Sequence, residues 1–571
     1  MKQYFLLVLV CFLWSCGTLR NQSTVSKDSI QKIIQDYEQL GALINDKFPS
    51  YWPNNSEEKL DFEESQLGLL KNRLQSISFD EIDKQSQINF ELLSLIIEDR
   101  LFHIDFETHL FPLNSEGGFL AGVVYSTQNQ KAKNEEAFEK YKEKLSTLPT
   151  YFKQRENQMR LGQQKGKSSP KIIVQNCLKL IEALLNTPIG DLFFMNAVKG
   201  DIQRESIILA LIDKEIIPAY KQLQTFLQEE YLVNAPEEVG VAEIRDGKSF
   251  YEQRVRFFTT LDMSPKEIFE TGQEEVKRIR SEMEAVIEKV GFEGSFADFL
   301  AFLRTDQQFY PKSPAALLEK AAWITTEMQG KLPQYFGKIP RMPLTVKPVP
   351  ATLAPNYTGG RYSPGSYNRN RAGQYWVNTY KLESRPYYVL PALSLHEGVP
   401  GHHLQMMLSA EIEGVPNFRK NTYLSAFGEG WGLYSEYLGK EAGIYQTPYE
   451  DFGRLTYEMW RACRLVVDPG MHYMGWTRAE AIDFMASNTA LSLHEVNTEI
   501  DRYIGWPGQA VSYKIGELKI RALREQAEKE LGSKYDIRNF HDRLLENGSV
   551  PLSTLDRIIQ EFIADEQRNN N

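Results

Sequence analysis

The chain has 571 residues, 42% of them hydrophobic and 25% charged, which is typical of a soluble globular protein large enough to bury a sizeable core. The net charge of −11 argues against nucleic acid as the main partner, because nucleic-acid-binding proteins carry basic patches. The chain contains only four cysteines, so a disulfide-stabilised framework is excluded.

The N-terminus has the pattern of an export signal. A basic start precedes an apolar run at 5–14, which is too short to span a bilayer as a mature helix. The sequence Leu-Trp-Ser-Cys at 13–16 resembles a bacterial lipobox, in which the cysteine is acylated and becomes the new N-terminus. We expect a signal peptide at 1–16, lipidation of Cys16, a polar tether at 17–30, and a membrane-anchored body in the periplasm or at the outer membrane. A plain secretory signal that is cleaved nearby is the alternative.

From about 30 to 339 the apolar residues recur at three- and four-residue spacing, which predicts helices. Ser264-Pro265 is a further helix start, with serine as the cap and proline in the first turn, for a helix that runs to about Val290. Cys177 and Cys463 lie among apolar residues in helical patterns, so we expect two free buried thiols. The other helices predicted in this region are 31–43, 80–104, 135–161, 171–185 and 202–231.

The composition changes at Pro340, because residues 340–391 contain eight prolines together with several glycines and many tyrosines. Short strands are predicted at 344–349 and 374–380, and the chain returns to helical patterns from about 392 to its end. We therefore expect a mostly α-helical fold with a small sheet. An N-terminal helical region at 31–339 and a catalytic region at 340–571 are expected to form one continuous fold.

Three of the eight histidines lie within eight residues, in the sequence His396-Glu-Gly-Val-Pro-Gly-His-His403. The common zinc pattern His-Glu-x-x-His fails here, because position 400 is proline. On a regular helix, His396 and His402 would point about 120° apart, and His403 would be in phase with His396 but about 10 Å further along the axis. Because Pro400 distorts a helical turn and Gly401 tolerates unusual dihedrals, we predict an irregular helix at 399–402 that returns His402 to His396.

A catalytic zinc ion needs three protein ligands and one open position. The helix predicted at 424–438 offers Glu429, whose small and apolar neighbours make its carboxylate costly to bury unless it is paired or bound to metal. Glu436 lies two turns further on the same face and is expected to hydrogen-bond a ligand. A second His-Glu pair, His494-Glu495, has no other histidine nearby and is expected to cap or pack a helix. The sequence therefore predicts Zn²⁺ bound by His396, His402 and Glu429, with Glu397 as general base.

The metal motif and several later stretches resemble the bacterial family known as domain of unknown function 885. The matching stretches are Phe-x-Glu-Gly-Trp-x-Leu-Tyr at 427–434, and residues 461–475, 502–516 and 540–552. This family is grouped with metallopeptidases that use a glutamate as third zinc ligand, so the resemblance implies a large helical fold with zinc at the floor of a deep cleft. In the family pattern the histidine directly after Pro-Gly is regular and the next one is variable, which favours His402 over His403 as the ligand.

The resemblance also implies that the protein cleaves short peptides, like a carboxypeptidase or a dipeptidyl carboxypeptidase, with zinc-activated water and Glu397 as the base. Relatives in this group stabilise the oxyanion with a histidine or tyrosine from a later helix, which makes His472, Tyr503 and Tyr513 candidates. A tyrosine packed in the interior is the alternative for each tyrosine. Arg464 and Lys514 are candidates for holding a free C-terminal carboxylate, with ordinary salt bridges as the favoured alternative. The strand at 374–380, with Asn378, is expected to bind the substrate backbone by strand addition.

Two other functions fit the same residues. One is a zinc hydrolase of a non-peptide amide or ester, which the same zinc and glutamate would serve. The other is an exported lipoprotein that binds peptides without cleaving them. The presence of Glu397 together with all three expected ligands argues against this second alternative.

Overall fold

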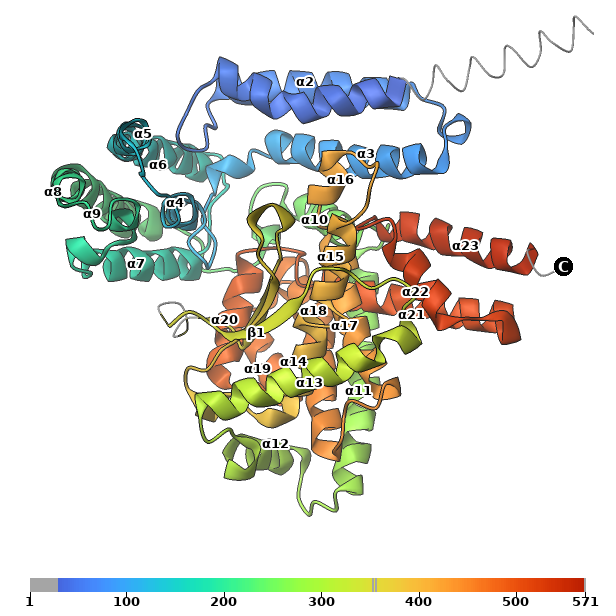
Figure 1. The fold of residues 1–571 in the computed structure, drawn as a ribbon. Helices are drawn as coiled ribbons and strands as arrows, with labels where there is room; N and C mark the ends of the chain where they lie inside the picture. Colours follow the sequence, from blue (N-terminus) through green and yellow to red (C-terminus); the bar gives the residue numbers. More distant parts are fainter. Residues whose placement is uncertain (1–28, 352–353, 355–356, 569–571) are drawn as a thin grey trace, which may run out of the picture.

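A computed structural model of the chain describes residues 29–351, 354 and 357–568. The predicted signal peptide with Cys16, and residues 17–28 of the predicted tether, lie outside these residues. The fold is mostly α-helical with one three-stranded sheet, which confirms the predicted fold class (Figure 1). Within the described ranges, no helix has both the length and the apolar character needed to cross a bilayer.

The N-terminal helices form two groups (Figure 1). The helix at 29–47, α2 (Glu57–Gln75) and α3 (Lys84–Asp105) lie along one side of the molecule. A separate lobe contains α4 (Phe119–Thr127), α5 (Glu135–Ser146), α6 (Leu148–Gln164), α7 (Lys171–Leu185), α8 (Ile202–Leu211) and α9 (Ile217–Thr225). The helix predicted at 171–185 is observed with those bounds, the one at 135–161 is divided at Thr147, and the run at 202–231 includes π-helical turns at 212–216 and 226–231.

Four helices connect this lobe to the sheet. They are α10 (Gly247–Thr259), α11 (Pro265–Lys289), α12 (Phe296–Thr305) and α13 (Pro314–Tyr335). The predicted start of α11 is confirmed, because the Ser264 hydroxyl accepts from the Glu267 backbone N–H while the Glu267 carboxylate accepts from the Ser264 backbone N–H. This capping box satisfies two backbone donors at the beginning of the helix.

The sheet contains β1 (Leu344–Pro348), β2 (Gly360–Ser363) and β3 (Gly373–Val377) in the order β1-β3-β2. β3 is the central strand, parallel to β1 and antiparallel to β2, so both of its edges are paired. The prediction that this strand adds a substrate strand is therefore wrong, because a strand with two partners has no free edge. β2 is four residues long and carries no alternating pattern that would have identified it.

Asn378 is fully buried immediately after β3. Its side-chain N–H groups donate to the carbonyl oxygens of Ala354, Tyr357 and Thr358, and its side-chain oxygen accepts from the Tyr380 backbone N–H. The side-chain N–H groups hold the loop that precedes β2, and the side-chain oxygen holds the turn that follows β3. The prediction that Asn378 binds substrate is therefore wrong.

The C-terminal region packs around one central helix, α18. Its elements are α14 (Leu390–Glu397), α15 (His402–Ala410), α16 (Asn417–Asn421), α17 (Ser425–Glu441), α18 (Pro448–His472), α19 (Arg478–Asn488), α20 (Leu493–Ile504), α21 (Ser512–Leu531), α22 (Ile537–Leu545) and α23 (Leu552–Arg568). Nearly every side chain of α18 is buried, and α11, α14 and α17 all contact it. α18 is thus surrounded on all sides, which explains its few exposed positions.

Two hydrophobic clusters form the core. One joins Leu92 of α3 to Trp431 of α17, and the other joins Phe152 of α6 to Met459 of α18. Each cluster combines residues from before and after Pro340, so neither belongs to one of the two predicted regions alone. Cys177 and Cys463 are both free and buried, as predicted.

Candidate metal centre

The predicted helix irregularity lies directly beside the candidate ligands. α14 ends at Glu397 and α15 begins at His402, and residues 398–401 form a turn in which the Val399–Pro400 peptide bond is cis. Across this turn the Gly401 N–H donates to the Leu395 carbonyl at 3.0 Å and the His403 N–H donates to the Gly398 carbonyl at 3.1 Å. The interruption at 398–401 confirms the predicted irregular helix.

Gly401 makes the turn possible by a close backbone approach. A Cβ atom at this position would lie 2.0 Å from the carbonyl oxygen of His396, a separation that no real contact permits. The close approach brings the imidazole rings of His396 and His402 to a centroid distance of 4.7 Å, nearly perpendicular to each other. The two predicted histidine ligands are therefore neighbours in the folded chain.

α17 brings the third predicted ligand to these two rings. The Glu429 Oε2 atom lies 3.4 Å from His396 Nε2 and 3.5 Å from His402 Nε2, and ligand atoms of the three residues all lie within 4.8 Å of one another. Both Glu–His separations exceed a normal hydrogen bond of about 2.9 Å. They match the edge of a tetrahedron, about 3.3–3.6 Å, whose centre is about 2.0–2.2 Å from each ligand atom, as in zinc sites. Two imidazoles and one carboxylate are also a donor set that suits zinc.

Glycines allow α17 to approach the site. A Cβ atom at Gly432 would lie 2.5–2.8 Å from the His396 ring atoms, and one at Gly428 would lie 2.3–2.4 Å from the Tyr423 ring. At Gly430 the neighbour is α21, where a Cβ atom would lie 2.5 Å from the Gly516 carbonyl carbon. The alternating glycines on either side of Glu429 thus make room for a ligand ring, for a tyrosine and for a packed helix.

Glu436 orients His396, as the sequence predicted. Its Oε1 atom lies 2.8 Å from His396 Nδ1, and its side chain is almost fully buried. A carboxylate at this distance accepts a hydrogen bond from Nδ1–H, which leaves the lone pair of Nε2 directed towards Glu429 and a metal ion. Arg461 approaches the same Glu436 oxygen at 3.6 Å from its Nη2 atom.

The charges at the centre favour a cation. Burial lowers the pKa of His396, but the Glu429 and Glu436 carboxylates outweigh this effect and raise that pKa to about 9. Burial raises the pKa of Glu429, but His402 and His396 outweigh it and hold this pKa well below its usual value. The carboxylates thus attract positive charge to the imidazole nitrogens, and a divalent metal ion satisfies the same attraction.

Glu397, the predicted general base, is held by the outer edge of the sheet. Its Oε2 atom accepts from the Tyr362 backbone N–H of β2 at 2.7 Å, and its side chain is half-buried. Tyr423 donates its hydroxyl proton to Glu429 Oε1 at 2.8 Å, so only Oε2 of this carboxylate faces the histidines. Neither tyrosine was identified from the sequence, since both contacts arise from pairing between distant segments.

His403 is turned away from the centre. Its Nδ1 atom lies 3.0 Å from the Tyr362 hydroxyl and its Nε2 atom lies 3.0 Å from the Met342 carbonyl oxygen. The carbonyl can only accept, so Nε2 carries the proton, Nδ1 accepts from Tyr362, and no lone pair is free for a metal ion. Burial lowers the pKa of His403 to about 4, so the ring stays neutral at pH 7. His402, and not its neighbour, therefore faces Glu429.

Two predicted oxyanion donors lie elsewhere. His472 is fully buried, its Nδ1 accepts from the Val241 backbone N–H, and its Nε2 donates to the Tyr503 carbonyl. The Tyr503 hydroxyl is also fully buried and accepts from Trp460 Nε1 at 3.1 Å and from Arg464 Nε at 2.7 Å. The structure contradicts both predictions, because these groups are engaged within the protein. Tyr513 is half-buried and its hydroxyl has no hydrogen-bond partner among the described residues, so it stays a candidate.

The two predicted carboxylate-binding residues differ. Lys514 is fully buried, and its Nζ atom contacts Glu517 at 2.7 Å, Glu458 at 2.8 Å and Glu275 at 3.0 Å. Three carboxylates saturate the ammonium group, so the prediction that Lys514 binds substrate is wrong and the salt-bridge alternative holds. Arg464 contacts Tyr503 and Glu499, but its Nη1 atom is buried without a partner among the described residues.

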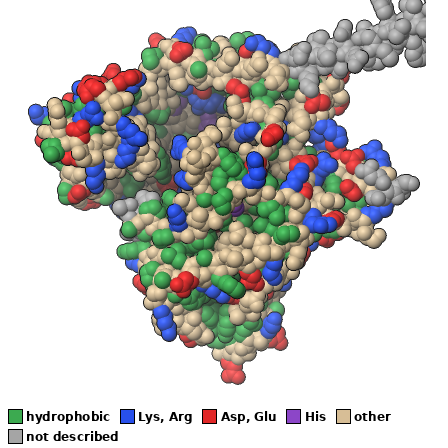
Figure 2. All heavy atoms as spheres, in the orientation of Figure 1, with side chains coloured by type: hydrophobic (Ala, Val, Ile, Leu, Met, Phe, Trp, Pro, Cys, Tyr) green, Lys and Arg blue, Asp and Glu red, His purple; other side chains and the backbone are tan. Residues whose placement is uncertain are grey.

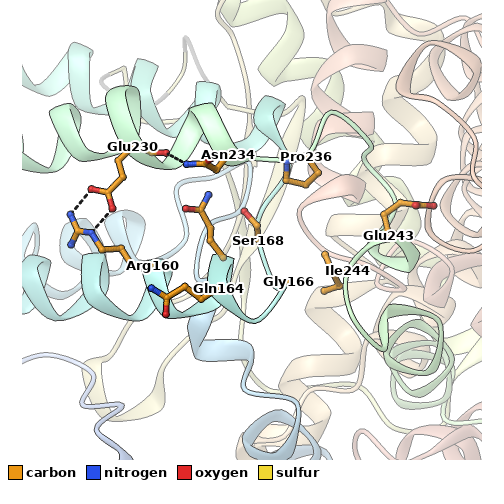
Figure 3. Close-up of a pocket in the computed structure, with 10 residues that line it drawn as sticks. Arg160, Gln164, Gly166, Ser168, Glu230, Asn234, Pro236, Glu243 and Ile244 are labelled. Carbon is orange, nitrogen blue, oxygen red and sulfur yellow. Dashed lines mark hydrogen bonds and ion pairs between the residues drawn. The ribbon is translucent and has the colours of Figure 1, made fainter.

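A separate pocket of about 520 Å³ lies between α6 and the segment at 230–244 (Figure 3). Arg160 and Glu230 form an ion pair of 2.6 Å on its wall. None of the predicted site residues lines this pocket. The face drawn in Figure 2 is in addition hollowed between the α4–α9 lobe and the rest of the molecule.

The comparisons with known proteins agree with the fold. A family model described as bacterial protein of unknown function (DUF885) matches residues 36–559. A candidate lipoprotein from Colwellia psychrerythraea superposes with a TM-score of 0.86 at 26% sequence identity, over 95% of this chain and 99% of that chain. A candidate lipoprotein of unknown function from Shewanella oneidensis superposes with a TM-score of 0.71 at 16% identity, over 94% of this chain and 98% of that chain, a likeness of fold alone. No curated protein matches the chain.

Proposed function

The chain belongs to the bacterial family of proteins of unknown function DUF885, and because that family has no assigned activity, we propose one from the metal centre: a zinc-dependent hydrolase that cleaves short peptides. The observation that carries this proposal is the convergence of His396, His402 and Glu429, with Glu429 Oε2 at tetrahedral separations from both histidine Nε2 atoms and all three ligand atoms within 4.8 Å of one another. Three protein ligands leave one coordination position open, which is the arrangement of catalytic rather than structural zinc sites.

The chain's own residues have distinct roles in this chemistry. A bound zinc ion would polarise the scissile carbonyl and lower the pKa of its bound water to about 7. Glu397 removes a proton from the attacking water and returns it to the leaving amine, while the Tyr362 N–H fixes the orientation of its carboxylate. Glu436 holds His396 in the tautomer that binds metal through Nε2. Tyr513 is our candidate for donating a hydrogen bond to the oxyanion.

The peptide specificity rests on the resemblance to glutamate-liganded metallopeptidases, whereas the hydrolytic chemistry rests on the site itself. A hydrolase of another amide or an ester would use the same ligands and the same Glu397. The discriminating observation is therefore the substrate that is cleaved, and not the metal that is bound.

We also propose that the protein is exported and anchored through a lipid on Cys16, in the periplasm or at the outer membrane. The lipobox-like sequence at 13–16 supports this anchor, as does the similarity to two candidate lipoproteins. A peptidase at this location would act on peptides outside the cytoplasm.

The function is tested by metal analysis together with a library of quenched fluorescent peptides, for the unchanged protein and for Glu397→Gln. We expect about one zinc ion per chain in both proteins, cleavage by the unchanged protein, and at least a 100-fold lower cleavage rate in the variant. Zinc binding without Glu397-dependent cleavage of any peptide would defeat the peptidase proposal, and cleavage of esters alone would select the alternative hydrolase.

A further inference from the structure

A cluster of arginines lies beside the metal centre, and the proposed chemistry does not use it. It consists of Arg461 and Arg464 on α18 and Arg385, which lies between the short 3-10 helices η12 (Leu382–Ser384) and η13 (Tyr387–Val389) that precede α14. Tyr457 on α18 and Glu495 on α20 complete the group that we name the arginine pocket. Arg461 and Arg464 are 5% and 3% exposed, so their charges are removed from bulk solvent.

Each of the three arginines has a buried N–H group without a partner among the described residues. These groups are Arg385 Nε, Arg461 Nε and Arg464 Nη1. The guanidinium of Arg385 makes no hydrogen bond or ion pair at all within the described part of the chain. Buried N–H groups are normally satisfied, so three unpaired donors on charged groups in one place indicate an acceptor that the protein itself does not supply.

Glu495 does not satisfy these donors. Its carboxylate interacts electrostatically with Arg385, Arg461 and Arg464, but it forms no hydrogen bond or ion pair with any of them. The contrast is Lys514, which three carboxylates of the same region contact at 2.7–3.0 Å. The carboxylate of Glu495 is therefore near the arginines without pairing with their free N–H groups.

The charges around the pocket leave positive charge unmatched. Arg464 and Arg502 share Glu499, at 3.2 and 3.0 Å, and Arg461 lies 3.6 Å from Glu436. Counting Arg385 and Glu495, the four arginines meet only three carboxylates. A bound anion would balance this excess.

The pocket adjoins the catalytic groups through two contacts. Glu436 lies between His396, at 2.8 Å, and Arg461, at 3.6 Å. On the other side, the buried Tyr375 interacts electrostatically with both Glu397 and Tyr457, and the Tyr457 hydroxyl has no hydrogen-bond partner among the described residues. The arginines are therefore close enough to the catalytic groups for one bound peptide to be recognised by both.

The aromatic rings beside the arginines suit a peptide end. The Trp460 ring stacks against the guanidinium groups of both Arg461 and Arg464, each 4.4 Å from the ring centroid, and Tyr513 stacks on Arg464 at 4.2 Å. Stacking fixes the planes of the guanidinium groups, so the unpaired N–H groups keep fixed directions and can each donate a hydrogen bond to a carboxylate. The aromatic rings provide apolar surface for an adjacent side chain.

We propose that the arginine pocket binds the free C-terminal carboxylate of a peptide substrate, so that cleavage takes place near the C-terminal end. This inference rests on the proposed peptidase function for its substrate but on the arginines for its specificity. An acidic side chain within a peptide offers the same chemistry, and the experiment separates the two sources. An arginine outside this group, Arg361 of β2, has an exposed side chain that lies over the Tyr357 ring and interacts electrostatically with Glu397, and it supplies a matched control.

The test measures peptide binding to the zinc-loaded Glu397→Gln variant, which is expected to bind substrates without cleaving them. A degenerate mixture of N-acetylated tetrapeptides with free C-termini is compared with the same mixture as C-terminal amides, and retained peptides are quantified by mass spectrometry. We expect the free acids to be retained at least tenfold more than the amides. Adding Arg385→Gln should lower this ratio at least fivefold, Arg385→Lys should restore part of it, and Arg361→Gln should leave it unchanged.

Several results would overturn the proposal. They are equal retention of acids and amides, no retention of either mixture, loss of the preference in Arg361→Gln but not in Arg385→Gln, and retention of amides only when they contain Asp or Glu. The thermal unfolding midpoint of each variant checks that the fold is intact. A protein that holds zinc but cleaves no peptide would defeat the proposed function. The retention ratio would still decide the present proposal, because binding is measured without turnover.

Discussion

Adjacent histidines at positions 402 and 403 have opposite environments in this protein. His402 points its Nε2 atom at Glu429, whereas both nitrogens of His403 are used by Tyr362 and Met342. Neighbouring positions therefore carry a candidate metal ligand and a structural side chain. The distinction depends on the turn at 398–401, which sets the phase of α15 relative to α14.

The first prediction follows from this difference. We expect His402→Asn to lose stoichiometric zinc and all zinc-dependent activity, because two ligands hold the ion too weakly. His403→Asn should keep about one zinc ion per chain and lose about 1–3 kcal/mol of stability, because it disturbs buried hydrogen bonds to Tyr362 and Met342. Metal analysis after dialysis and urea denaturation measure the two effects. Zinc loss in the His403 variant with retention in the His402 variant would reverse the ligand assignment.

Part of the centre could be read from single residues. The sequence predicted the ligands His396, His402 and Glu429 as a set and identified Glu436 as a partner, because helical spacing and the proline are local properties. His472 and Lys514 were misassigned because they have partners, Val241 and Glu275, in segments more than two hundred residues away. Tyr503 was misassigned because its partners Trp460 and Arg464 lie on another helix, α18. No spacing rule gives such partners.

At the scale of elements, the metal centre depends on two helices that approach each other without side chains in between. Gly432 of α17 lies against the His396 ring, and Gly401 lies against the His396 carbonyl. The absence of a side chain at Gly432 thus leaves room for the His396 ring, and its absence at Gly401 leaves room for the His396 carbonyl. This is a packing requirement that propensity alone would not reveal, since glycine weakens a helix interior by about 0.5–1 kcal/mol.

We predict that Gly401→Ala disrupts the centre. Its Cβ atom would meet the His396 carbonyl oxygen at 2.0 Å, so α14 and α15 must move apart, at a cost of about 1–3 kcal/mol or more. The separation would also carry His402 away from His396, and zinc affinity should fall at least tenfold. Denaturant titration and a competitive zinc-chelator assay measure the two effects.

The matched control is Gly68→Ala on α2, where no atom lies within 4 Å of the added Cβ. This variant should be slightly more stable, by about 0.5–1 kcal/mol, and should bind zinc unchanged. If Gly401→Ala bound zinc as tightly as this control, the close approach would not be required for the site.

The same scale explains which elements could be predicted. Long periodic helices such as α7 and α11 were found with nearly the observed bounds, because their apolar stripes and caps are local signals. β2 was missed and β3 was given a free edge, since the order of strands in a sheet is a tertiary property. The strand that contacts Glu397 is therefore the one without a sequence signal.

At the scale of the whole molecule, buried histidines make the stability of the fold depend on pH. His541 is fully buried, its Nδ1 atom lies 2.9 Å from the Tyr335 carbonyl, and its Nε2 atom lies 2.7 Å from the Tyr434 hydroxyl. The carbonyl accepts the Nδ1 proton, so Nε2 accepts from Tyr434 and cannot take a second proton without losing this bond. Burial accordingly lowers the pKa of His541 to about 3.

This shift predicts acid destabilisation. Below pH 6.5 the unfolded chain protonates His541 and the folded chain does not, so stability present above pH 6.5 is lost progressively as the pH falls towards 3. Between pH 7.5 and pH 5 the loss from this one residue is about 2 kcal/mol. His541→Asn keeps a donor for the Tyr335 carbonyl, and its free energy of unfolding should fall by about 2 kcal/mol less over the same interval.

Urea denaturation at the two pH values measures this difference, with His494→Asn as the control because that side chain is exposed. The prediction would be contradicted if the free energy of unfolding had the same pH dependence in the His541 variant and the unchanged protein. The buried ring would then take up as many protons in the folded chain as in the unfolded chain. The comparison uses differences between variants, so other titrating groups cancel.

The core itself joins distant parts of the chain, since both hydrophobic clusters combine residues from before and after Pro340. Composition and helical periodicity predicted a mostly α-helical protein, but the presence of α3 and α17 in one hydrophobic cluster, and of α6 and α18 in the other, depends on the complete fold. This packing holds Glu429 and Glu436 in position, because α17, which carries them, and the neighbouring α18 are both buried along most of their length.

The central claim is that His396, His402 and Glu429 bind a zinc ion beside the turn between α14 and α15. Its most direct test is a crystal structure of the zinc-loaded protein with anomalous difference maps above and below the zinc absorption edge. We predict one strong zinc peak about 2.0–2.2 Å from His396 Nε2, His402 Nε2 and Glu429 Oε2. A map without a peak at these three atoms, or with zinc bound through His403, would contradict the claim.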